Sequence, residues 1–145
     1  LFFFLMIRRP PRSTLSSSSA ASDAYKRQKV LIVDDSPTEV HVLKGILEQG
    51  GHSVSSADNA EDGIKQAKAT KPDVILMDVV MPGMNGFQAT RALTRDPDTQ
   101  HIPIIIVTTK DQETDRVWGM RQGAKDYVTK PVEAPDLLAK LKAVL

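Results

Sequence analysis

From residue 29 onward, compact hydrophobic runs alternate with longer segments in which hydrophobic residues recur every three or four positions. Most of the runs are rich in valine, isoleucine and leucine, which is typical of strands buried on both faces. We expect strands at residues 29–33, 52–56, 73–77, 103–107 and 126–129, the second being the weakest. The segments between and after them predict helices at residues 37–49, 59–70, 87–94, 112–122 and 133–145.

The clearest helix start directly follows the first expected strand. Ser36 suits the N-cap, Pro37 the first helical position, and Glu39 the third, where a glutamate can complete a capping box. Gly50 and Gly51 then end the helix. We therefore expect this helix to begin within a few residues of the end of the first strand.

The succession of strand and helix units predicts an α/β fold. Right-handed crossovers between such units produce a parallel sheet with helices on both faces. The flavodoxin-like, doubly wound arrangement has strand order 2-1-3-4-5 and five helices, and its site lies at the carboxyl ends of the strands, beside the point where the order reverses. We expect residues 29–145 to form one domain of this kind.

Residues 1–28 have a different composition. Seven apolar residues are followed by arginines, two prolines and a run of serines. This apolar run is far shorter than the ~20 residues of a spanning helix, and a signal peptide would carry its positive charge before the run. We expect a disordered tail. Residues 6–15 and 18–28 also resemble translated sequencing-adapter DNA, with one difference at Ala24, so we interpret the tail as an assembly artefact and expect the native chain to begin near Lys29.

Composition excludes several classes of function. The chain has no cysteine, which excludes thiol catalysis, disulfides and cysteine-ligated zinc. Its three histidines are not at metal-ligand spacing. Residues 1–28 carry a net charge of +4 and the remainder a net charge of −3, so the basic excess comes from the tail alone. We therefore expect neither a nucleic-acid partner nor a membrane partner.

Polar residues that can do chemistry follow four of the expected strands. They are Asp34 and Asp35 after the first strand, Asp78 after the third, Thr108 after the fourth and Lys130 after the fifth. Each has an ordinary explanation when taken singly: acids are common where helices begin, and most lysines are solvated. Their agreement at one edge of the sheet instead predicts a single cleft with three carboxylates, one hydroxyl and one ammonium group.

This set of groups indicates phosphoryl chemistry with a hard cation. Three neighbouring carboxylates raise one another's pKa unless a cation lies among them. All-oxygen ligands favour Mg²⁺. A carboxylate can attack phosphorus and form an aspartyl phosphate, while a metal ion, Lys130 and the Thr108 hydroxyl can neutralise the phosphoryl oxygens.

Four segments resemble the signatures of CheY-type response-regulator receiver domains: LIVDDSPTE, LMDVVMPGMNGF, PIIIVTTK and GAKDYVTKP. They lie at the family's spacing and span residues 29–145. The resemblance implies that the phosphoacceptor is Asp78, the metal ligands are Asp34, Asp35, Asp78 and the Val80 backbone carbonyl, the phosphoryl-binding residues are Thr108 and Lys130, and the switch residues are Thr108 and Tyr127. It also implies a cis peptide bond between Lys130 and Pro131.

The same resemblance implies a cytoplasmic two-component signalling switch rather than a conventional enzyme. The phosphoryl group would come from a histidine kinase or a histidine phosphotransfer domain, and the chain would catalyse the transfer to itself and its own dephosphorylation. Phosphorylation would then change the surface formed by residues 112–122, 126–129 and 133–145, which a downstream protein would bind. The residues of these motifs are most similar to those of single-domain regulators of type IV pilus twitching motility.

The sequence disfavours two other functions and leaves a third open. An aspartyl phosphatase would have an Asp-x-Asp pattern, but Val80 occupies the second position after Asp78. A flavodoxin-like cofactor binder would have a Ser/Thr-rich phosphate loop after the first strand, where this chain has two acids. A receiver that has lost a DNA-binding output domain stays open as an alternative, because the sequence stops within or just after the last expected helix.

Overall fold

The computed structural model describes residues 28–81 and 83–145. The predictions made for the tail therefore lie outside the described residues, apart from Gln28 at its end. Within the described part of the chain, no helix is both long and apolar enough to cross a bilayer.

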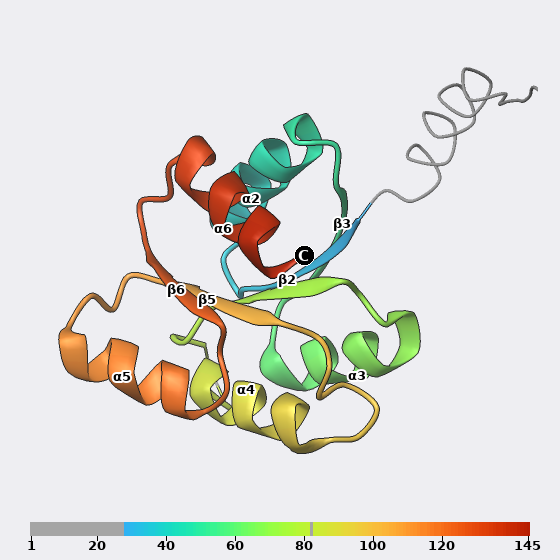
Figure 1. Ribbon diagram of the computed structural model, residues 1–145, viewed down its shortest axis with the longest axis vertical. Helices are drawn as coiled ribbons and strands as arrows, with labels where there is room; N and C mark the ends of the chain where they lie inside the picture. Colours follow the sequence, from blue (N-terminus) through green and yellow to red (C-terminus); the bar gives the residue numbers. More distant parts are fainter. Residues whose placement is uncertain (1–27, 82) are drawn as a thin grey trace, which may run out of the picture.

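The described residues form one parallel sheet of five strands in the order β3-β2-β4-β5-β6 (Figure 1). The strands are β2 (Lys29–Val33), β3 (Ser53–Ala57), β4 (Val74–Met77), β5 (Ile104–Thr108) and β6 (Asp126–Thr129). In chain order this is 2-1-3-4-5, so the predicted topology is confirmed. Observed and expected strand ends differ by one residue at most. Two of these differences are at carboxyl ends, where Ala57 and Thr108 are the last residues of β3 and β5.

The helices lie on both faces of the sheet. Their bounds are α2 (Pro37–Gln49), α3 (Ala60–Thr70), α4 (Gly86–Arg95), α5 (Glu113–Arg121) and α6 (Ala134–Val144). Figure 1 shows α2 and α6 on one face and α3, α4 and α5 on the other. Helix α4 begins one residue before its expected start because Asn85 and Gln88 form a complete capping box there.

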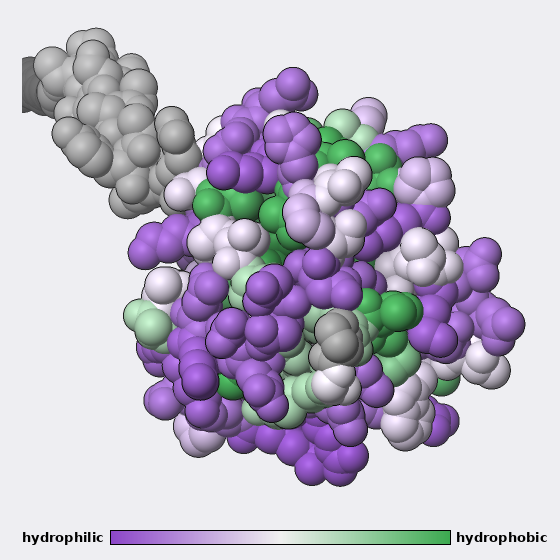
Figure 2. Space-filling model, turned by 180° about the vertical axis from the view of Figure 1, so that it is seen from behind, coloured by the Kyte–Doolittle hydropathy of each residue, from purple (hydrophilic) through white to green (hydrophobic). Residues whose placement is uncertain are grey.

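Alternate residues of the strands pack on opposite sides of the sheet. In β2, Val30 and Ile32 belong to the hydrophobic cluster that includes Leu43 of α2 and Leu137 of α6. Their neighbours in the same strand belong to a second cluster, on the side of α3 and α4. Because both faces are covered, β2 and β4 read as continuous hydrophobic runs. The surface seen from behind in Figure 2 is mostly hydrophilic, with small hydrophobic patches between polar side chains.

Strand β3 is the edge strand next to β2, and it was the weakest strand in the sequence. Its serines at positions 53, 55 and 56 are exposed, and only Ala57 is buried. An edge strand with one uncovered face does not need a hydrophobic run. The predicted site residues lie at the carboxyl ends of the other four strands, β2, β4, β5 and β6, which are consecutive in the sheet.

Candidate functional site

Three carboxylates meet where β2 and β4 end. One oxygen from each of Asp34, Asp35 and Asp78 lies within 4.8 Å of the others. β2 and β4 are paired, and the Asp78 N–H donates to the Val33 carbonyl at 2.9 Å, which extends the pairing by one residue. Asp34 and Asp78 are 3% and 7% exposed, whereas Asp35 is exposed. The cluster therefore has two buried acids and one that faces solvent.

Backbone N–H groups hold the two buried carboxylates in place. The Ser36 N–H donates to Asp34 Oδ1 at 3.0 Å. The Val80 N–H donates to Asp78 Oδ1 at 3.3 Å, so the Val80 backbone lies beside the cluster. Both bonds join a carboxylate to the residue two positions later, a local geometry that aspartate readily adopts in turns.

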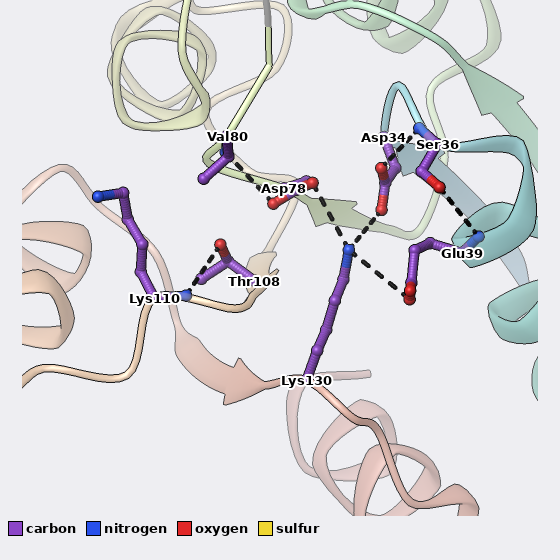
Figure 3. A network of polar contacts seen from close by, with 8 residues as sticks. All are labelled: Asp34, Ser36, Glu39, Asp78, Val80, Thr108, Lys110 and Lys130. Atoms are coloured by element: carbon purple, nitrogen blue, oxygen red, sulfur yellow. Dashed lines mark hydrogen bonds and ion pairs between the residues drawn. The ribbon is translucent and has the colours of Figure 1, made fainter.

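Lys130 supplies the positive charge of the site from the end of β6. Its Nζ donates to Asp34 Oδ2 at 2.7 Å and lies 3.5 Å from Asp78 Oδ2 and 3.8 Å from Glu39 Oε2. The Lys130 side chain is only 7% exposed. Figure 3 shows the ammonium group among these carboxylates, with Thr108 on the far side of Asp78. The peptide bond between Lys130 and Pro131 is cis, as expected.

Burial and charge shift the pKa values of the two central groups. Burial, together with the neighbouring charge of Asp34, raises the pKa of Asp78 above its ordinary value, although Lys130 opposes this. Burial alone would lower the pKa of Lys130, but its hydrogen bond to Asp34 and the charges of the surrounding carboxylates outweigh this effect, so the pKa of Lys130 is raised. Lys130 therefore stays charged at neutral pH, and the charged form of Asp78 is disfavoured by its surroundings.

Thr108 and Tyr127 are linked through the backbone of Lys110. Thr108 is fully buried at the end of β5, and its Oγ accepts the Lys110 N–H at 3.4 Å. Tyr127 is 2% exposed, and its hydroxyl donates to the Lys110 carbonyl at 2.7 Å. Burial and the negative charge of Asp115 raise the pKa of Tyr127 to about 12. The Tyr127 ring is therefore packed inside the molecule, with Arg116 5.8 Å from its centroid.

The structure brings all of the predicted site residues to one edge of the sheet, and it adds Glu39. The sequence assigned this glutamate to a capping box, of which only one half is formed. The Glu39 N–H donates to Ser36 Oγ at 3.4 Å, but the Ser36 N–H is taken by Asp34. The Glu39 side chain turns to Lys130 instead. Glu39 lies in the first turn of α2, which begins beside the carboxyl ends of the strands. This position was the signal in the sequence that could have identified Glu39 as a site residue.

The acidic cluster fits a divalent cation of the Mg²⁺ type. Mg²⁺ takes oxygen ligands and is usually bound by one or two carboxylates together with water and phosphate oxygens. Asp34, Asp35 and Asp78 present such oxygens close together, and one of the three acids is open to solvent. Lys130 compensates only part of their charge, so a cation would relieve the remaining repulsion.

Comparisons with known proteins agree with this geometry. Residues 30–142 match the family described as "Response regulator receiver domain". The chain is 62% identical over 117 residues to Protein PilH of Pseudomonas aeruginosa, covering 81% of this chain and 97% of that protein. It is 38% identical over 116 residues to Response regulator PleD of Caulobacter vibrioides, covering 80% of this chain but only 26% of PleD. The solved structure of chemotaxis protein CheY4 of Vibrio cholerae superposes with a TM-score of 0.77 at 31% identity, covering 82% of this chain and 99% of that one.

Proposed function

The chain belongs to the family of response regulator receiver domains, and on this premise we propose that Asp78 is the residue that accepts the phosphoryl group. A receiver domain is a phosphoacceptor rather than a conventional enzyme, and it implies a cognate histidine kinase. The observation that carries the proposal is the position of Asp78. It is a buried carboxylate within 3.5 Å of the Lys130 ammonium and inside an acidic cluster that fits a cation.

In the proposed transfer, a carboxylate oxygen of Asp78 attacks the phosphorus of a phosphohistidine. The phosphohistidine ring carries a proton on its other nitrogen, so imidazole leaves as the neutral base when the phosphorus–nitrogen bond breaks, and an acyl phosphate forms on Asp78. Lys130 and the Thr108 hydroxyl would bind the phosphoryl oxygens. Asp34, Asp35, Asp78 and the Val80 carbonyl would hold Mg²⁺, which supplies further positive charge to those oxygens when bound.

We further propose that phosphorylation changes the surface formed by α5, β6 and α6. Thr108 and Tyr127 both form hydrogen bonds with the backbone of Lys110. A movement of the Thr108 hydroxyl toward the phosphoryl group would therefore shift this backbone and change the position of the Tyr127 side chain. A shift from 1:99 to 99:1 needs about 5.5 kcal/mol, and one charge-assisted hydrogen bond supplies only about 1.5–3 kcal/mol. Lys130 and the metal must therefore contribute as well. Trp118 of α5 is 49% exposed and would report the change.

At a finer level, we propose a role in the control of type IV pilus twitching motility. The 62% identity to PilH over nearly all of that protein supports a common role. The partners would be a histidine kinase or histidine phosphotransfer domain and a downstream protein, all in the cytoplasm.

The direct test is phosphorylation with acetyl phosphate and Mg²⁺. We expect intact-mass measurements to find one added phosphoryl group on the wild type and none on Asp78→Asn, and we expect Asp35→Ala to bind Mg²⁺ more weakly. Beryllofluoride with Mg²⁺ should change the fluorescence of Trp118, the only tryptophan of the chain, in the wild type but not in Asp78→Asn. Full labelling of Asp78→Asn at another residue would show that the phosphoacceptor lies elsewhere.

A further inference from the structure

The side chain of Glu39 contacts the charged lysine of the site rather than its own helix start. Its Oε2 lies 3.8 Å from Lys130 Nζ. The backbone N–H that a capping box would offer to Glu39 is already bonded to Asp34. The carboxylate of Glu39 is thus free of the local role that its sequence position suggests.

The three carboxylates around Lys130 are not equivalent. Among the described residues, Lys130 forms ion pairs with Asp34, Asp78 and Glu39. In Figure 3, Asp78 and Glu39 approach the ammonium group from opposite sides, and Asp34 holds it between them. The attraction of Glu39 therefore draws the Lys130 ammonium group away from Asp78, where the phosphoryl group would be bound.

We propose that Glu39 is a positioning residue that competes with the phosphoryl group for Lys130, and that it weakens phosphoryl binding at Asp78. This inference rests on the proposed function. Before phosphorylation, Glu39 shares the ammonium group with the two buried acids. When the phosphoryl group is on Asp78, Lys130 must serve its oxygens instead, and the attraction of Glu39 opposes this.

The ion pair between Glu39 and Lys130 has the modest strength expected of a residue that modulates the site. The Glu39 side chain is 42% exposed, compared with 2% for Asp34, and its distance to Lys130 is longer by about one ångström. Asp34 is therefore the main partner of Lys130, and Glu39 is a weaker, solvent-screened competitor. Losing Glu39 should improve phosphoryl binding without dismantling the site.

The test compares Glu39→Gln with the wild type in beryllofluoride binding at saturating Mg²⁺, measured by isothermal titration calorimetry. Glutamine keeps the hydrogen-bonding ability of a capping-box residue but has no charge. We expect binding to tighten by about two- to fivefold, the range for a partly exposed ion pair. The gain should shrink at high salt, which screens such a pair. An effect on helix stability alone would not produce this salt dependence.

Asp58→Asn is the matched control. Asp58 lines the same hollow as Asp34 and Asp35 and is exposed, but it is not one of the carboxylates paired with Lys130. The Asp58→Asn variant should change the affinity for beryllofluoride by clearly less than Glu39→Gln does. Equal gains in both variants, or no gain in Glu39→Gln, would overturn the role of Glu39 while leaving the phosphoacceptor assignment intact. A wild type that fails to bind beryllofluoride with Mg²⁺ would overturn the proposed function and this inference with it.

Discussion

The surroundings of Asp78 disfavour the charged form of its carboxyl group. It is 7% exposed, close to Asp34, and only partly compensated by Lys130. Burial is the largest cause of its raised pKa, and the Lys130 charge is the largest opposing effect. A buried acid held in this way is reactive toward an electrophile and lowers the stability of the unmodified fold.

At the scale of this residue, Asp78→Asn should make the metal-free protein more stable at neutral pH. Because the folded pKa of Asp78 is raised above the ordinary 3.8, the stabilisation linked to its protonation is complete below that value. It is lost as the pH rises through the folded pKa. The wild type therefore loses stability as the pH rises from 3.8, whereas the amide of the variant does not titrate, so the melting temperature of the variant should be higher at pH 7.

Melting temperatures measured with chelator from pH 7 down to pH 4 will check this expectation. The difference between Asp78→Asn and the wild type should become smaller toward acid pH. Asp58→Asn, which removes an exposed carboxylate, should show a much weaker trend. A variant that is less stable than the wild type at pH 7 would mean that the partners of Asp78 outweigh its burial.

Helix α4 is seated directly on the backbone of the phosphoacceptor loop. A Cβ added at Gly86, the first residue of α4, would lie 2.1 Å from the Asp78 carbonyl oxygen and 2.8 Å from the Val79 Cα. The Gly86 N–H also donates to the Val79 carbonyl at 3.1 Å. The absence of a side chain at this position allows the element to approach the strand end that carries Asp78.

At the scale of this element, Gly86→Ala should destabilise the protein by about 1–3 kcal/mol, the usual cost of overpacking. The clash is with backbone atoms, which cannot rotate away, so the loop after β4 must move. Urea unfolding measures the loss, and phosphorylation by acetyl phosphate should slow as Asp78 is displaced.

The matched control is Gly45→Ala in α2. An added Cβ at this helical position meets nothing within 4 Å, and alanine is favoured over glycine in a helix by about 1 kcal/mol. This variant should therefore be slightly more stable than the wild type. Equal behaviour of the two variants would show that helix propensity, and not the contact with Asp78, determines the effect at Gly86.

For the whole molecule, we propose that the folded unit begins at the end of the unusual segment formed by residues 1–28. The Ser53 N–H donates to the Gln28 carbonyl at 2.8 Å, so a shortened chain should keep this residue. We expect removal of residues 1–27 to leave the free energy of unfolding and the phosphorylation by acetyl phosphate unchanged. A loss of more than about 1 kcal/mol, a typical effect of a single mutation, in urea unfolding would show that these residues stabilise the domain.

The order and type of the elements, and the residues at the strand ends, could be predicted from the amino-acid sequence alone. Hydrophobic runs and helical spacing are local properties, and a parallel sheet places every strand's carboxyl end at the same edge. Asp34, Asp78 and Lys130 could therefore be assigned to one site from their positions alone, and the observed contacts agree. Strand ends were less exact, because Ala57 and Thr108 belong to their strands through pairing with other strands.

The partners that these side chains bind depend on the three-dimensional fold. Asp34 and Lys130 are 96 residues apart, and their 2.7 Å contact forms only when β2 and β6 lie in one sheet. The same fold leaves Glu39 without its expected capping partner and brings Lys130 within its reach. It also buries the Tyr127 ring against the Lys110 carbonyl. A side chain takes the acceptor that is free and near in space, and the spacing of residues along the chain does not contain that information.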